Sequence, residues 1–231
     1  MTDSAITAIL HAAPYLWGGL EFSLELTAFA FLAGIVLGTA FALIRHARVP
    51  ILSSIVQGYI ALMRSIPLIL VLFWFFFLVP ILLGHLTPSG RPIPIGPVST
   101  AFITFALFEA AYYAEIVRVG LRAIPKGQFE AAKALALPPF HVYGSIILPQ
   151  VLRATSPIIL SQTIILFQDT SLVYVLSITD LMGAASKLAQ LNGHLIELYL
   201  TVAVVYLVLS SAASQGVAFL RTRNSLARGR R

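Results

Sequence analysis

The 231-residue chain contains no cysteine and very little charge. Only 10% of its residues are charged, whereas an ordinary soluble domain carries about a quarter. The missing cysteines exclude disulfides, thiolate metal sites and cysteine nucleophiles. Because 58% of the residues are hydrophobic, the chain cannot cover its surface with polar groups, and lipid is the solvent in which its fold must be considered.

The N-terminus lacks the features of a cleavable signal. Asp3 and His11 precede or interrupt the first apolar run, and no basic segment comes before it. The net charge of +6 comes from arginine-rich loops and not from a continuous basic face, so no nucleic-acid partner is expected.

Long apolar runs recur along the whole sequence. A helix needs about 20 such residues to cross a bilayer at a rise of 1.5 Å per residue. Five runs meet this length, and the predicted spans are 18–44, 66–83, 97–117, 157–178 and 195–220. The predicted fold class is therefore all-α, a polytopic membrane helical bundle that forms one transmembrane domain over 1–231.

Lysine and arginine are distributed unevenly between the loops. The loop at 45–48, the stretch 118–153 and the tail 221–231 hold most of the 15 basic residues. The positive-inside rule predicts that these segments are cytoplasmic and that the N-terminus lies outside. Pro67 interrupts the long apolar segment between them, so we expect a helix at 49–65 along the cytoplasmic surface, followed by the second span.

Five acidic residues within the predicted spans stand out. A charge there costs about 2.5–3.5 kcal/mol on insertion scales, so each needs a reason. The five are Glu21, Glu25, Glu109, Glu115 and Asp169. Glu21 and Glu25 lie near the outer end, where headgroup water reaches them, and Glu115 is spaced to pair with Arg118. Glu109 either forms a hydrogen bond between helices or lines a pathway, and the sequence leaves both interpretations open.

The fourth span contains a continuous polar run, which consists of Gln168, Asp169, Thr170 and Ser171. A uniform helix would point these side chains around most of its circumference, including toward lipid. The run predicts a segment that faces the bundle or is locally irregular beside water. The alternative is that it only holds helices together.

The loop between the third and fourth spans reads as two short helices. Residues 130–137, EAAKALAL, favour a helix, Pro138-Pro139 interrupts it, and a second apolar helix continues to Pro149. Two such helices without a core of their own, exposed in the cytoplasm, indicate a surface that a partner covers.

This loop resembles the signature of the permease subunits of type I ABC importers. That signature is EAA, three residues, Gly, nine residues, Ile, any residue and Leu-Pro. The matching positions are Glu130, Ala131, Ala132, Ala136, Ile146, Leu148 and Pro149. Ala136 replaces the glycine, so we expect Pro138 to set the turn instead.

The resemblance extends over the whole chain and is to the polar amino acid branch of that family. Blocks that begin at Met63, Phe108 and Phe167 (MRSIPLILVLFWF, FEAAYYAEIVRVGLRAIPKGQ and FQDTSLVYVLS) are most similar to glutamate/aspartate permeases. The resemblance implies cytoplasmic coupling helices in 118–153 that contact an ATPase subunit through Glu130. It also implies that the block with Asp169 lies beside the substrate pathway.

The same resemblance implies a multisubunit importer in the bacterial inner membrane. The chain has no GxxxxGK[ST] loop, so ATP and Mg²⁺ are expected on a separate ATPase and no cofactor or metal on this chain. A second permease, identical or homologous, and an extracytoplasmic binding protein complete the expected set. Arg64 either anchors to headgroups or binds a substrate carboxylate bidentately.

Two alternatives belong to other classes. An intramembrane enzyme is suggested only by His194 with Glu197 and by Ser186-Lys187, without an HExxH helix. A stand-alone channel or secondary transporter would show internal repeats, and none is evident. The sequence therefore predicts a permease subunit without catalytic residues.

Overall fold

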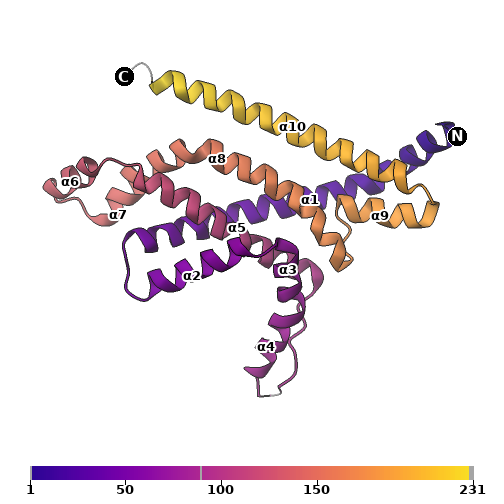
Figure 1. Cartoon of the computed structure of the whole chain (residues 1–231), viewed down its shortest axis with the longest axis horizontal. Helices are drawn as coiled ribbons and strands as arrows, with labels where there is room; N and C mark the ends of the chain where they lie inside the picture. Colours follow the sequence, from indigo (N-terminus) through magenta and orange to yellow (C-terminus); the bar gives the residue numbers. More distant parts are fainter. Residues whose placement is uncertain (1, 89, 229–231) are drawn as a thin grey trace.

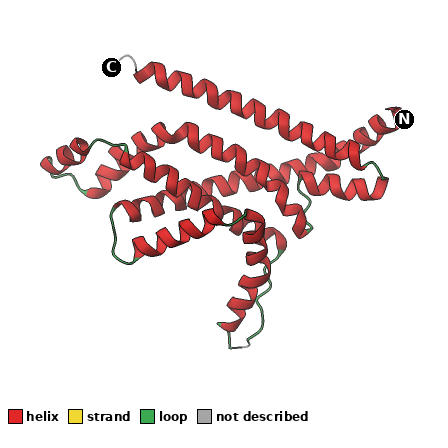
Figure 2. Cartoon of the chain, viewed as in Figure 1, coloured by secondary structure: helices red, strands yellow, loops and turns green. Residues whose placement is uncertain are grey.

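The computed structural model describes residues 2–88 and 90–228, with side chains from Leu10 to Phe219 except at position 89. Within these residues the chain is helical and contains no strand (Figure 2). The longer helices are α1 (Thr2–His46), α2 (Leu52–Ser65), α5 (Pro97–Arg122), α8 (Leu148–Asp169), α9 (Leu181–Asn192) and α10 (Leu195–Arg228). The shorter ones are α3 (Leu68–Phe73), η1 (Trp74–Leu78), α4 (Val79–His85), α6 (Lys126–Ala134), α7 (Pro139–His141), η2 (Val142–Ile147) and η3 (Thr170–Leu176).

Five helical segments of the described chain are long and apolar enough to cross a membrane. They are Leu10–His46, Leu68–His85, Pro97–Arg122, Pro139–Leu176 and Leu195–Phe219. The number and order of the predicted spans are confirmed. The first starts nearer the N-terminus than expected, and the fourth starts earlier because α7, η2 and α8 follow one another without a break.

The helices α1, α5, α8 and α10 run lengthwise through the molecule, whereas α3 and α4 project away from it (Figure 1). The loop after α1, the loop with α6 and α7, and the C-terminal end of α10 all lie at one end of the bundle (Figure 1). These are the three segments rich in lysine and arginine, so we call this the basic end. If the three segments all face the cytoplasm, they must lie at the same end of the bundle, as they do here.

The helix α2 does not lie apart as a surface helix, and that expectation is wrong. It folds back along α1 (Figure 1) and buries Val56, Ile60 and Met63 in the core shared by α1, α3 and α5. Tyr59 also donates a hydrogen bond of 2.6 Å to the carbonyl of Leu107 in α5. An amphipathic face suits the headgroup surface or the bundle equally, and here the bundle covers it. The break at Pro67 is confirmed, because α2 ends at Ser65 and α3 begins after the proline.

The spans α1 and α5 approach each other closely at Gly38. A Cβ atom on Gly38 would lie 2.8 Å from the carbonyl oxygen of Ala110 and 2.8 Å from the amide nitrogen of Ala114. Small residues allow the backbones of membrane helices to approach and gain dispersion contacts, which is the main attraction available in lipid. Gly38 therefore sets the distance between the two helices that carry the largest part of the core.

The opposite end of the bundle is fixed by Asp180, which precedes α9. This buried side chain accepts hydrogen bonds from the N–H groups of Met182 (3.1 Å) and Gly183 (2.9 Å), and so caps the helix. Burial raises the pKa of the Asp180 carboxyl to about 6, although the two N–H groups act in the opposite direction. The N–H of Leu181 donates to Ser23 at 3.3 Å, which ties the start of α9 to α1.

We expect Gly38→Leu to destabilise the protein by about 1–3 kcal/mol through overpacking, and to lower its melting temperature in detergent by several degrees. Gly18→Leu is the matched control on the same helix, because a Cβ there meets nothing within 4 Å. Fluorescence melting of both variants measures the difference. Equal melting temperatures would show that the close approach at Gly38 is not needed.

Candidate functional site

Glu109 is a carboxylate buried inside the bundle. It lies on α5 with a relative exposure of 1%. The amide of Gln162 on α8 donates to both of its oxygens, at 3.2 Å to Oε1 and 3.3 Å to Oε2. A buried charge needs more partners than one long, shared amide hydrogen bond, so the carboxylate can accept a further donor or cation.

Asp169 and Arg64 lie in the same part of the bundle. Tyr112 follows Glu109 by about one helical turn on α5, and the charge of Asp169 acts on both side chains. The guanidinium of Arg64 lies over the Tyr112 ring, 5.5 Å from its centroid, in a cation–π arrangement. Three of the predicted pathway residues are thus gathered around one tyrosine, and we call Arg64, Glu109, Tyr112, Gln162 and Asp169 the polar cluster.

The polar run after Gln168 is locally irregular, as predicted. The α-helix ends at Asp169, and a 3₁₀ helix continues from Thr170 to Leu176. The four side chains diverge: Gln168 donates to Ser210 on α10 at 3.1 Å, and buried Thr170 donates to the Phe167 carbonyl at 2.7 Å. Asp169 and Ser171 remain partly exposed. Gln168 thus contacts α10, whereas only Asp169 of the run belongs to the polar cluster.

Nearer the basic end, Glu115 forms the predicted ion pair with Arg118. The Arg118 Nε donates to Oε2 at 2.8 Å, and its Nη2 donates to Oε1. Arg45 of α1 adds a second cation at 3.1 Å. The sequence did not predict Arg45 in this role, because its contact depends on how α1 packs against α5.

Sequence reasoning also missed Gln162 and Tyr112. Gln162 precedes Asp169 by seven residues, or about two helical turns, and a regular helix places both on one side. That spacing was the available signal. Tyr112 offered none, because an aromatic residue in a span is ordinary.

The loop 118–153 has a small core, so the expectation that its helices have none is wrong. Ala132, Val142 and Ile147 are buried together with Ala42 of α1 and Val117 of α5. His46 at the end of α1 stacks on Phe129 with ring centroids 5.8 Å apart. Gln128 and Gln150 join α6 to α8 by exchanging two amide hydrogen bonds of 3.0 and 2.9 Å.

Ala136 adopts the left-handed conformation that the family signature reserves for glycine, with φ of 52°. The Leu137 N–H donates to the Ala132 carbonyl at 3.0 Å, and the Ala136 N–H donates to the Lys133 carbonyl at 2.9 Å. This pair of bonds is a Schellman motif, which ends α6. The expectation that Pro138 would set the turn in its place is wrong, because the motif requires a left-handed residue at 136.

Several residues of the loop face outward at the basic end. Leu135 is 71% exposed and Phe140 is 91% exposed, and Glu130 is exposed beside them in sequence. The remaining signature residues have mixed exposure: Ala131 and Pro149 are exposed, Ile146 and Leu148 are half-buried, and Ala132 is buried. Two large apolar side chains and one carboxylate on a basic, otherwise polar loop form a surface suited to a protein partner.

The residues suggested for enzyme chemistry make other contacts. His194 Nδ1 lies 3.6 Å from Glu197 Oε1 within one helical turn. Lys187 donates to Thr179 and to the Ser177 carbonyl (3.4 Å), whereas Ser186 accepts from Gln190 at 3.3 Å. In the described part of the chain, no group of three or more His, Asp or Glu side chains is placed to hold a metal ion.

A five-span helical bundle with a buried carboxylate between its spans and an exposed loop at its basic end is typical of a membrane transport subunit. The comparisons with known proteins agree. The family model described as "Binding-protein-dependent transport system inner membrane component" matches residues 30–225. The chain therefore belongs to this family of membrane permease components of binding-protein-dependent transport systems.

Curated relatives cover almost the whole chain. It is 40% identical over 219 residues to the "Glutamate/aspartate import permease protein GltK" of Escherichia coli O6:H1, covering 95% of this chain and 97% of that one. It is 30% identical over 217 residues to the "Probable glutamine ABC transporter permease protein GlnP" of Bacillus subtilis (strain 168), covering 91% and 94%.

Solved structures share the fold. "Crystal structure of an amino acid ABC transporter with histidines" matches with a TM-score of 0.80 at 24% identity, covering 94% of this chain and 97% of that one. A MetNI methionine ABC transporter matches with a TM-score of 0.72 at 20% identity, covering 90% and 95%. The helical architecture is thus that of ABC importer permeases.

We expect Ala136→Gly to stabilise the end of α6 by about 1 kcal/mol, because glycine adopts the left-handed conformation without a clash at Cβ. Ala134→Gly, two residues earlier in a helical position, should instead destabilise α6 by about 0.5–1 kcal/mol. Hydrogen exchange of the α6 amides measures both changes. The same direction of change in the two variants would contradict a strained left-handed Ala136.

Proposed function

We propose that this permease carries acidic and related polar amino acids, glutamate and aspartate first, through the polar cluster. The observation that carries the proposal is Glu109, a buried carboxylate with one amide donor, which has the charge of Asp169 near it, while Arg64 stacks on Tyr112 one helical turn away. The chain's 40% identity to a glutamate/aspartate import permease supports the choice of substrate.

The charges of the cluster match the groups of an amino acid. Glu109 is buried with a single amide donor, so a substrate ammonium would supply the cation that its neighbourhood lacks. Asp169 adds a second acceptor, and Ser171 after it is a neutral hydroxyl. The planar guanidinium of Arg64 can bind a substrate carboxylate through two hydrogen bonds when it leaves its position over the Tyr112 ring.

The loop at the basic end is the proposed contact with an ATPase subunit. Glu130 is exposed and supplies an acceptor for a charge-assisted hydrogen bond, while Leu135 and Phe140 supply apolar area. ATP and Mg²⁺ then bind the ATPase, and this chain binds no cofactor. A second permease and an extracytoplasmic binding protein complete the importer, with the basic end in the cytoplasm and the N-terminus outside.

Closure of the ATPase pair would push on α6 and change the bundle between outward-open and inward-open states. Gln128 and Gln150 link α6 to α8, so the push reaches the helix that carries Gln162 and Asp169. Reconstitution tests this directly. ATPase bound to the purified permease, and uptake of labelled glutamate that requires the ATPase and the binding protein, are the expected results. Uptake by the permease alone would assign it to the secondary transporters.

We expect Glu130→Ala to weaken binding of the ATPase on the order of 10-fold and to lower transport with it, because a charge-assisted contact is lost. Glu197→Ala is the control, since Glu197 is partly exposed and lies in the first turn of α10, at the other end of the bundle. Pull-down and uptake are measured on both. Normal ATPase binding and transport in Glu130→Ala would remove Glu130 from the interface.

Asp169→Asn keeps the shape of the side chain and removes its charge. We expect uptake to fall on the order of 10-fold or more, while basal ATP hydrolysis of the assembled complex persists. Glu25→Gln is the control, because Glu25 is an exposed carboxylate in α1 outside the polar cluster. Unchanged uptake kinetics in Asp169→Asn would limit the polar run to holding helices together.

Arg64→Lys tests the preference for acidic substrates. A lysine ammonium cannot match the planar geometry of a second carboxylate, so the apparent KM for glutamate or aspartate should rise about 10-fold. The KM for glutamine or asparagine should change much less. Equal changes for acidic and neutral substrates, or none, would leave Arg64 as an anchor at the surface of the bundle.

A further inference from the structure

His46, the last residue of α1, contacts two aromatic rings of the loop 118–153. Its ring stacks on Phe129 of α6 with the centroids 5.8 Å apart and the planes at 28°. It also meets Tyr143 of η2 edge to face, at 5.9 Å and 78°. Phe129 and Tyr143 lie 6.2 Å apart, so the three rings form one group, which we call the aromatic cluster. The aromatic cluster joins the end of α1 to two helical segments of the loop.

Consecutive residues of α6 hold two different helices of the bundle. Gln128 exchanges amide hydrogen bonds of 3.0 and 2.9 Å with Gln150 of α8. Phe129, the next residue, stacks on His46 of α1. Because aromatic pairs and paired amides both have preferred geometries, a displacement of α6 strains both contacts together.

The two helices held by α6 are also two that pack against Glu109. On α8, Gln162 donates to the Glu109 carboxylate. On α1, a Cβ atom at Gly34 would lie 3.1 Å from the Cβ atom of Glu109. Gly34 precedes His46 by about 18 Å at the rise of an α-helix, and no proline interrupts this part of α1. A movement of His46 can therefore reach Glu109 along one uninterrupted helix.

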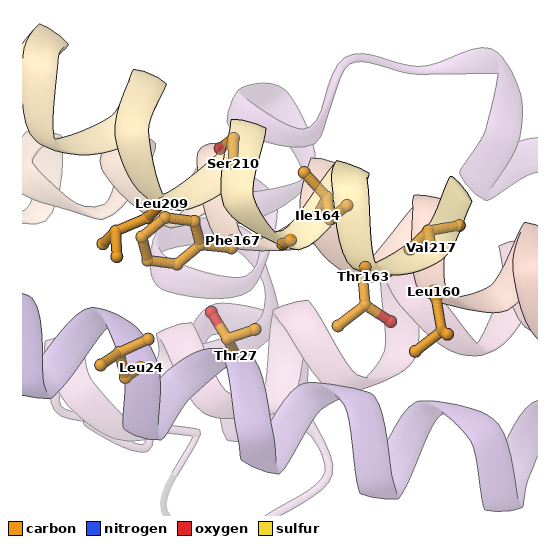
Figure 3. A pocket seen from close by; sticks show the side chains of 11 residues that line it. Leu24, Thr27, Leu160, Thr163, Ile164, Phe167, Leu209, Ser210 and Val217 are labelled. Atoms are coloured by element: carbon orange, nitrogen blue, oxygen red, sulfur yellow. The ribbon is translucent and has the colours of Figure 1, made fainter. Parts of the chain in front are cut away.

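Farther from the loop, α1 and α8 are separated. An apolar pocket lies between α1, α8 and α10 (Figure 3), with Leu24 and Thr27 on the α1 side and Leu160 and Thr163 on the α8 side. At this level α8 does not pack directly on α1. A link of its own to the loop thus gives α1 a connection that α8 does not supply there.

We propose that His46 is a positioning residue, through which the loop 118–153 moves α1 and the surroundings of Glu109 during ATP-driven import. The inference rests on the proposed contact of this loop with an ATPase. The link of Gln128 to α8 and the link of Phe129 to α1 then act as a pair, so the two helices that pack against Glu109 follow α6 together.

The test measures the number of ATP molecules hydrolysed per glutamate imported by the assembled complex in proteoliposomes. His46→Ala removes both ring contacts, so we expect this ratio to rise about 3-fold or more while the ATPase still binds. His46→Phe keeps an aromatic ring and should restore a ratio near that of the wild type. His11→Ala, the same substitution at an exposed histidine near the other end of α1, is the control.

A ratio in His46→Ala equal to that of the wild type would overturn the proposal, whatever its melting temperature, because a purely structural role lowers the amount of folded complex without changing the ratio. A ratio raised equally in His46→Phe would also overturn it. Should His46→Ala fail to fold, Phe129→Leu removes the stacked ring and keeps an apolar side chain, and the same outcomes decide. Wild-type uptake without the ATPase would instead overturn the proposed function, and this inference with it.

Discussion

Glu109 is the constraint on which the interior of the bundle depends. A carboxylate with 1% exposure inside a membrane protein has to be compensated locally, and a single amide from Gln162 does this only in part. The hydrogen bonds fix the register of α5 against α8, and they bring Asp169 and Tyr112 into the same region. Buried charges that are incompletely paired are unfavourable in a resting scaffold, and a transporter retains them where a charged substrate passes.

The helix α8 connects this constraint to the surface of the molecule. It extends from Leu148 to Asp169, about 33 Å at the rise of an α-helix, and carries Gln150 near one end and Gln162 and Asp169 toward the other. Gln150 is bonded to α6, and the cluster residues are bonded to or near α5. These contacts give a displacement of α6 a route along α8 to the environment of Glu109. The proposed coupling thus has a continuous physical route from the α6–α8 contact to the α5–α8 contact, and each of the two contacts can be tested by its own variant.

Much of the architecture could be predicted from the sequence because it depends on local patterns. Hydropathy gave the five spans, and the i,i+3 spacing gave the pair of Glu115 with Arg118. Contacts set by packing were not predictable: Arg45 reaches Glu115 only because α1 and α5 are close. The predicted position of α2 was wrong because its apolar face can be covered either by lipid headgroups or by the helical bundle, and the sequence does not distinguish the two. Ala136 was also misjudged, since the two hydrogen bonds that end α6 outweigh the cost of a left-handed alanine.

We propose that ATP hydrolysed by a partner drives amino acid import through this chain. The most direct measurement is uptake of labelled glutamate into proteoliposomes that contain the assembled complex and enclose Mg²⁺ with either ATP or a non-hydrolysable analogue, with binding protein outside. We expect accumulation against a gradient with ATP and none with the analogue. Accumulation that persists with the analogue and follows an imposed ion gradient would contradict it.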